Sequence, residues 1–193
     1  MFAALWLPAV AGAQEGELKL GAQAASRLWV EGGSNVRSWT CHAKQIEASV
    51  TGGAVAPTAS VKEVSAAASR AVLTVPVAAL DCRNGTMNEH MRKALKADAN
   101  KTIQYRIATW ELTPRGDDEG SVTTSGTLVI AGTEKPISVE LTAKRAAQGT
   151  WQLKGDKTIR MTEWGVKPPS LMFGTMKVHD PVTVGFELVL EPK

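Results

Sequence analysis

Few residues of this 193-residue chain have the spacing of a catalytic or metal-binding site. The three histidines, His42, His90 and His179, lie far apart and show no ligand spacing typical of a metal site. The chain has no phosphate-binding glycine loop, no Gly-x-Ser-x-Gly turn, no Cys-x-x-Cys pair and no His-Glu-x-x-His helix. Because no sequence motif indicates a nucleophile or a cofactor site, we expect a binding protein without a cofactor, not an enzyme.

The chain contains two cysteines, Cys41 and Cys82. The uncharged apolar run from Phe2 to Ala13 ends in small residues and is typical of a secretory signal peptide and its cleavage site. We therefore expect residues 1–13 to be a signal-peptide remnant and the protein to be exported. In an oxidising compartment the two thiols are free to form a disulfide, and two unlinked buried thiols are the alternative.

Composition indicates one soluble globular domain over residues 14–193. The apolar fraction is 44% and the charged fraction 21%, which fits neither a disordered nor a membrane-spanning chain. The net charge of +3 comes from scattered basic residues, so we expect no nucleic-acid partner. This small excess allows a transient contact with an anionic membrane surface, although simple solubility is the more ordinary explanation.

Alternation of apolar and polar residues with period two dominates the rest of the chain. From Val182 to Leu190 every second residue is apolar, and Pro136 to Ala143 repeats the pattern. Further strands are expected at Leu28–Glu31, Trp39–Val50, Arg70–Val77, Thr102–Thr113, Ser121–Ala131, Thr150–Leu153 and Lys157–Glu163. Their number and spacing predict an all-β protein, either an antiparallel barrel or a sandwich.

One segment has helical periodicity instead. Met87, Met91 and Leu95 fall on one face of a helix predicted over residues 86–97, and Thr86 with Glu89 has the form of a capping box. A second short helix is expected at Val61–Ser69. On the first helix, His90 and Arg92 would suit a polar or phosphorylated headgroup, as would Lys93 and Lys96, and a solvated helix face is the alternative.

Large adaptable side chains are the strongest indication of a pocket. Tryptophans and methionines are frequent after the leader, and such side chains suit the wall of a cavity for a flexible hydrocarbon, although any one of them could simply fill a core. An apolar loop from Trp164 to Phe173 could cover the end of a barrel. The residues we expect to contact a ligand are Trp29, Trp39, Met87, His90, Met91, Arg92, Tyr105, Trp110, Trp164, Met172 and Phe173.

Several segments together resemble the YceI-like family of lipocalin-like bacterial proteins. They are Ser26–Val30, Arg83–Leu95, Gly126–Ile137, Ile159–Gly165 and Asp180–Val182. The resemblance implies an extended antiparallel barrel of about eight strands enclosing a tunnel, a periplasmic location, and binding of a polyisoprenoid or similar amphiphile such as an isoprenoid quinone or prenyl phosphate. The chain departs from the family at Trp164, where Phe is usual, at Met91 and residues 94–97, and in its cysteine pair.

Three functional classes follow from these observations. The leading one is a lipid carrier or reservoir. The second is a structural or interaction barrel whose interior is packed solid, and the third is an enzyme with His90 as general base acting on a bound lipid. A homodimer is compatible with each of them.

Overall fold

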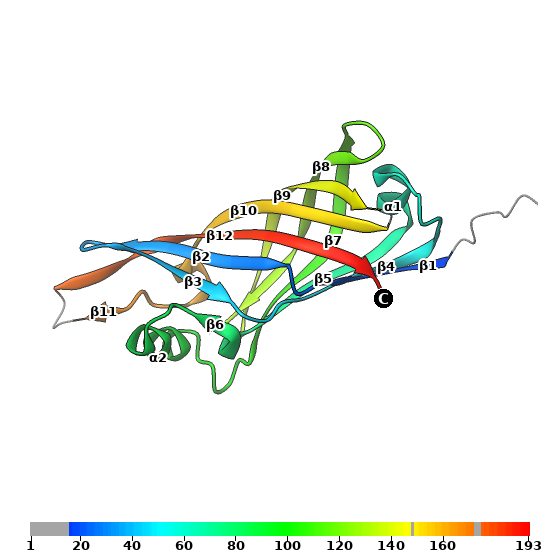
Figure 1. Cartoon of the computed structure of the whole chain (residues 1–193). Coiled ribbons are helices and arrows are strands. Elements are labelled where there is room, and N and C mark those ends of the chain that lie inside the picture. Colours follow the sequence, from blue (N-terminus) through cyan, green and yellow to red (C-terminus); the bar gives the residue numbers. More distant parts are fainter. Residues whose placement is uncertain (1–15, 148, 172–174) are drawn as a thin grey trace, which may run out of the picture.

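The computed structural model describes residues 16–147, 149–171 and 175–193 (Figure 1). The signal peptide predicted for residues 1–13 lies outside this part of the chain. The strands are β1 Gly16–Ala22, β2 Arg27–Ser34, β3 Ser38–Ala43, β4 Glu47–Val55, β5 Ala68–Pro76, β6 Leu80–Asp81, β7 Thr102–Pro114, β8 Glu119–Ile130, β9 Thr133–Ala147, β10 Thr150–Arg160, β11 Ser170–Leu171 and β12 Met176–Pro192. The helices are α1 Val61–Ala67 and α2 Gly85–Ala94, with 3-10 turns η1 Val77–Ala79 and η2 Met161–Trp164.

Eight antiparallel strands close into a barrel. They follow the order β1, β4, β5, β7, β8, β9, β10, β12, and β12 returns to β1 through the pair Leu20 and Pro192. Because β12 is 17 residues long, its remaining length also pairs with β2, which leads on to β3 and β6. The fold predicted from the sequence, an all-β lipocalin-like barrel of about eight strands with two short helices, is confirmed.

One half of the barrel interior is filled by its own side chains. Inward residues such as Leu20, Trp151, Leu188 and Leu190 are each at most 6% exposed. Helix α1 lies at this end (Figure 1), and its start is fixed by a reciprocal capping box between Ser60 and Glu63. This half therefore forms the packed core that holds the strands together.

Helix α2 lies at the opposite end of the barrel (Figure 1). Its N-cap is Asn84, whose side chain accepts a hydrogen bond from the backbone N–H of Met87, so the predicted cap at Thr86 is wrong. Asn84 has the extended backbone that an N-cap needs, so the cap lies two residues before Thr86 and the first helical residue is Gly85. It ends at Ala94, because Leu95 is the C-cap and Lys96 adopts a positive φ.

Among the described residues, no helix is long and apolar enough to cross a bilayer.

Candidate functional site

The half of the barrel next to α2 contains a cavity of about 620 Å³. This volume lies in the range of pockets that enclose small organic ligands. Strands β2, β3, β5, β6, β7, β8, β9, β10 and β12 contribute to its wall, together with α2 and η2. A barrel packed solid, the second class above, does not fit this interior.

Aliphatic side chains from the inward faces of the strands make most of the wall. In each strand these are alternate residues, as Val182 and Val184 show in β12, where the aromatic ring of Phe186 continues the same face. The other aliphatic strand residues in the wall are Leu28, Val30, Leu73, Val75, Leu80, Ile103, Leu128, Ile130, Ile137, Val139, Ile159 and Val178. We did not single them out from the sequence, although the period-two pattern placed most of them on strand faces. The wall can therefore hold hydrocarbon along its length.

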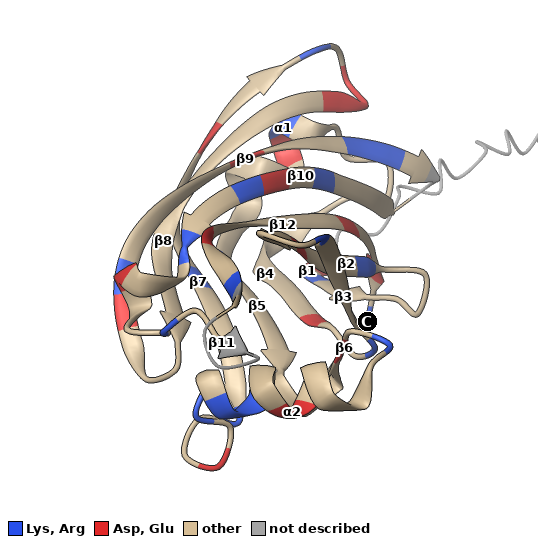
Figure 2. Cartoon of the chain, turned by 90° about the vertical axis from the view of Figure 1, so that its left-hand side faces the viewer, with Lys and Arg blue, Asp and Glu red and all other residues tan. Residues whose placement is uncertain are grey.

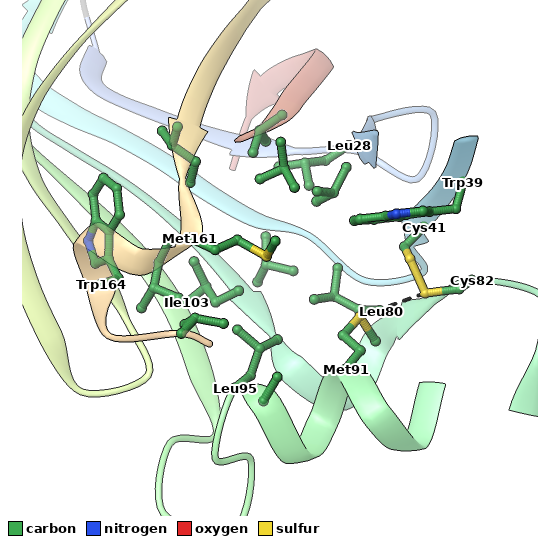
Figure 3. Close-up of a pocket in the computed structure, with 18 of the residues that line it drawn as sticks. Leu28, Trp39, Cys41, Leu80, Cys82, Met91, Leu95, Ile103, Met161 and Trp164 are labelled. Carbon is green, nitrogen blue, oxygen red and sulfur yellow. Dashed lines mark hydrogen bonds between the residues drawn. A yellow bond between two sulfur atoms is a disulfide. The ribbon is translucent and has the colours of Figure 1, made fainter. Parts of the chain in front are cut away.

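Six of the predicted ligand-contact residues line this cavity: Trp39, Met87, His90, Met91, Tyr105 and Trp164. The helical spacing of Met87 and Met91 turns both toward the barrel interior. Figure 3 shows Met91 of α2, Trp39 of β3 and Met161 of η2 around the same space. Met161 belongs to this wall although we did not predict it.

Three predicted residues do not line the cavity: Trp29, Arg92 and Trp110. Trp29 alternates with the inward residues of β2, and its indole lies on the outer surface against the backbone of Gly185. Arg92 is exposed on α2. Trp110 follows an irregularity in the register of β7, and its indole N–H donates to the carbonyl of Ser65 in α1, at the packed end. Met172 and Phe173 lie outside the described residues.

Two buried polar atoms in the wall of this cavity, which we also call the tunnel, lack a hydrogen-bond partner among the described residues. They are Nε1 of Trp39 and Nδ1 of His90. The indole of Trp39 lies over Gly32 of β2, where an added Cβ would come within 2.2 Å of the ring, so the glycine makes room for it. Because buried polar atoms are nearly always paired, both atoms have an unused capacity to form a hydrogen bond with a group placed in the cavity.

The hydroxyl of Tyr105 already forms a hydrogen bond within the protein. It lies 3.1 Å from Thr124 Oγ1, which in turn donates to the carbonyl of Val139 at 3.0 Å. Burial raises the pKa of Tyr105, so its side chain stays neutral at physiological pH. Tyr105 therefore adds an uncharged, apolar ring face to the cavity.

The cavity opens between α2 and the β2–β3 hairpin. Arg37, Asn84 and Thr86 are exposed to solvent and also line the cavity, so the opening lies among them. Ser34 lines the same region. The lining at the mouth is therefore polar, and the lining deeper inside is apolar except for Lys157 of β10, which pairs with Val184 of β12.

A disulfide bond joins Cys41 of β3 to Cys82 in the segment before α2, as predicted. Both cysteines line the cavity, and Cys82 Sγ lies 3.8 Å from Met91 Sδ (Figure 3). The same segment is held by Asp81, which pairs with Lys44 at 2.8 Å and accepts from the side-chain amide of Asn88. These bonds fix α2 at the tunnel mouth.

Trp164 seals the wall where two strands separate. The β9–β10 ladder ends at the pair Leu141 and Gly155, beyond which β9 pairs with β8 and β10 with β12. The indole of Trp164 is 1% exposed and donates to the carbonyl of Leu128 at 3.0 Å. The turn η2 therefore lies between β9 and β10 where these two strands separate, and Trp164 links it to β8.

No group of three metal-ligating side chains occurs in the described ranges.

Comparison with known proteins gives the same architecture. The YceI-like domain matches residues 30–190. A polyisoprenoid binding domain from Saccharophagus degradans superposes with a TM-score of 0.68 at 13% identity, covering 92% of this chain and 100% of that one. Burkholderia cenocepacia BcnA superposes with a TM-score of 0.66 at 20% identity (87% and 98% covered). The Campylobacter jejuni YCEI protein gives 0.58 at 17% identity (77% and 82%). No curated protein sequence matches significantly.

Proposed function

We propose, from the premise that this chain belongs to the YceI-like family, that it is a periplasmic carrier of an isoprenoid lipid. The observation that carries the proposal is the cavity of about 620 Å³ in one half of the barrel, with its aliphatic wall. The structural neighbour from Saccharophagus degradans described as a polyisoprenoid binding domain supports the ligand class. The disulfide between Cys41 and Cys82 is compatible with an oxidising compartment such as the periplasm.

The hydrocarbon tail would occupy the deep part of the tunnel. Burial of apolar surface contributes about 25 cal/mol per Å², so the aliphatic wall supplies the main driving force. Each additional isoprene unit that enters the tunnel should tighten binding by about tenfold or more, until the cavity is full. Binding in this form needs no reacting group in the wall.

The polar head of the ligand would lie near the mouth. Trp39 Nε1 is a donor, and His90 Nδ1 can donate or accept according to its protonation, so together they can bind a quinone carbonyl or a phosphate oxygen. Arg37 and Thr86 line the open side of the same region. An isoprenoid quinone and a prenyl phosphate both combine such a head with a long apolar tail.

Filling the tunnel with a side chain tests the proposal. Val184 lines the cavity near the middle of β12, so Val184→Trp should abolish uptake of a labelled long-chain prenyl alcohol, measured by fluorescence or filtration. Thr183→Trp is the matched control, because Thr183 faces outward and pairs with Thr158 through their hydroxyls. Thermal unfolding checks that both variants fold. Equal uptake by wild type and folded Val184→Trp would refute a ligand site inside the barrel.

A further inference from the structure

We propose that the open end of the tunnel docks on the surface of an anionic phospholipid bilayer. This inference rests on the proposed carrier function, because it names the surface from which the lipid would be taken. Two features of the mouth support it: an excess of basic residues, and one large apolar side chain, Val36, that is exposed there.

Basic residues are concentrated at the mouth. Four segments surround it: the tip of the β2–β3 hairpin (35–37), the α2 region (83–96), the η2 turn (160–167) and the start of β12 (176–180). They contain eight Lys or Arg and three Asp or Glu, whereas the rest of the chain has fourteen basic and sixteen acidic residues. We call the eight basic residues the basic rim: Arg37, Arg83, Arg92, Lys93, Lys96, Arg160, Lys167 and Lys177.

The charges of the basic rim are available to a partner. All eight residues are exposed, and none forms an ion pair with another described residue. The seven ion pairs of the described structure use other cations, such as Arg145 with Asp118 and Lys144 with Glu119 at the far end of the barrel. Figure 2 views the molecule from the mouth end and shows the Lys and Arg positions on α2. The mouth end therefore carries a net positive charge, which Asp180 beside Arg160 offsets only in part.

An apolar side chain projects from the same end. Val36, at the tip of the β2–β3 hairpin, is 63% exposed and is the one large hydrophobic residue so exposed in the described chain. The hairpin tip is held to the start of β12, because Asn35 and Lys177 exchange hydrogen bonds. A rigid tip with Val36 beside Arg37 is suited to the boundary between lipid headgroups and acyl chains.

These features together favour a bilayer as the occupant. An acidic protein partner would account for the basic rim. It would not account for the exposed apolar side chain of Val36, whereas a bilayer accounts for both. A surface of anionic headgroups attracts clustered Lys and Arg, each of which strengthens binding severalfold, and the attraction weakens with salt. Docking in this orientation would bring the opening at Arg37, Asn84 and Thr86 onto the membrane, so a lipid could enter the tunnel without crossing water.

Co-sedimentation with vesicles tests the inference. The full-length, delipidated protein is mixed with vesicles of phosphatidylglycerol and phosphatidylcholine, or of phosphatidylcholine alone, at low and high salt. The rim variant is Lys93→Glu with Lys96→Glu. The matched control is Lys62→Glu with Arg70→Glu, which makes the same change in net charge at two exposed residues of the packed end that form no ion pair in the described structure.

We expect wild type and the control variant to bind the anionic vesicles alike, and only at low salt. The rim variant should bind at least about tenfold more weakly, and Val36→Ser should reduce binding severalfold. Equal loss in both double variants would show that only net charge matters, and absence of vesicle binding would also overturn the inference. Binding to soluble polyglutamate as tight as to vesicles would indicate an acidic protein partner instead. Because the vesicles contain no isoprenoid, these outcomes are independent of ligand uptake by the tunnel.

Discussion

Cys41 and Cys82 face each other across two strands, and their disulfide extends a ladder that is otherwise only two residue pairs long. Strands β3 and β6 pair only through His42 with Asp81 and Ala43 with Leu80, and the cysteines occupy the next position. Helix α2 begins three residues after Cys82. The position of the helix at the tunnel mouth therefore depends on this disulfide, on the short strand β6 and on the hydrogen bonds that Asn88 forms with Asp81 and Cys82.

Loss of this disulfide should destabilise the protein and make helix α2 at the tunnel mouth more mobile. Closing a loop between residues 41 apart contributes about 4 kcal/mol on the chain-entropy model, so Cys41→Ala with Cys82→Ala should lower the free energy of unfolding by up to that amount. Denaturant titration measures it, and hydrogen exchange should show faster exchange in α2. Reduced wild type should behave like the double variant, and a reductant without effect on either measurement would contradict this prediction.

The unpartnered atoms of Trp39 and His90 should affect ligands with a polar head selectively. Trp39→Phe and His90→Phe each keep a ring but remove the polar atom, so we expect affinity for a prenyl phosphate or quinone to fall by about three- to tenfold each. Affinity for a hydrocarbon of the same length should stay the same or increase. Titrations with the two ligand types measure the difference, and an equal loss for both would assign the rings a packing role only.

Trp164 should stabilise both the fold and the enclosed ligand. In Trp164→Phe the partly buried carbonyl of Leu128 loses its donor, which should cost about 1 kcal/mol in the free energy of unfolding. The weaker seal between β9 and β10 should also speed ligand dissociation, as measured by exchange against unlabelled lipid. Trp29→Phe on the outer surface is the control, and an equal increase in its dissociation rate would contradict the sealing role.

Asp81 should make stability depend on acid pH. Hydrogen bonds from Lys44, Asn88 and the backbone N–H of Arg83 hold the pKa of Asp81 well below its usual range. A depressed pKa stabilises the folded state above the unfolded value of about 3.9, and this stabilisation is lost as the pH falls further.

The destabilisation caused by Asp81→Asn should therefore be full at neutral pH and shrink below about pH 4. Urea midpoints of wild type and variant over this range measure it. Asp156→Asn, at an exposed position on β10, serves as the comparison. A difference between wild type and Asp81→Asn that stayed constant with pH would exclude this role for the carboxylate.

Local patterns predicted most of the architecture. Alternation with period two identified most of the strands, because one face of each strand in a closed sheet must be apolar. It missed β1, and the single strand expected at Trp39–Val50 is divided into β3 and β4. The helical spacing of Met87 and Met91 correctly turned them inward. The helix start was displaced because Asn84 and Thr86 are both good caps, and only the backbone at Asn84 decides between them.

The orientation of the tryptophans was harder to predict. Trp29 is outward because the inward positions of β2 are Leu28 and Val30, yet its size alone suggested a pocket. An irregular register in β7 and the bond to Ser65 keep Trp110 at the packed end. The empty half of the interior depends on how side chains from eight strands fit together, which no local pattern records.

Native mass spectrometry of the protein purified without detergent tests the central claim most directly. We predict that wild-type protein, exported in its natural host, carries an additional mass that lipid extraction identifies as an isoprenoid, and that Val184→Trp lacks this mass. If wild type were uniformly free of lipid and remained so after incubation with isoprenoids of several lengths, the tunnel would not be an isoprenoid-binding site and the account would be wrong.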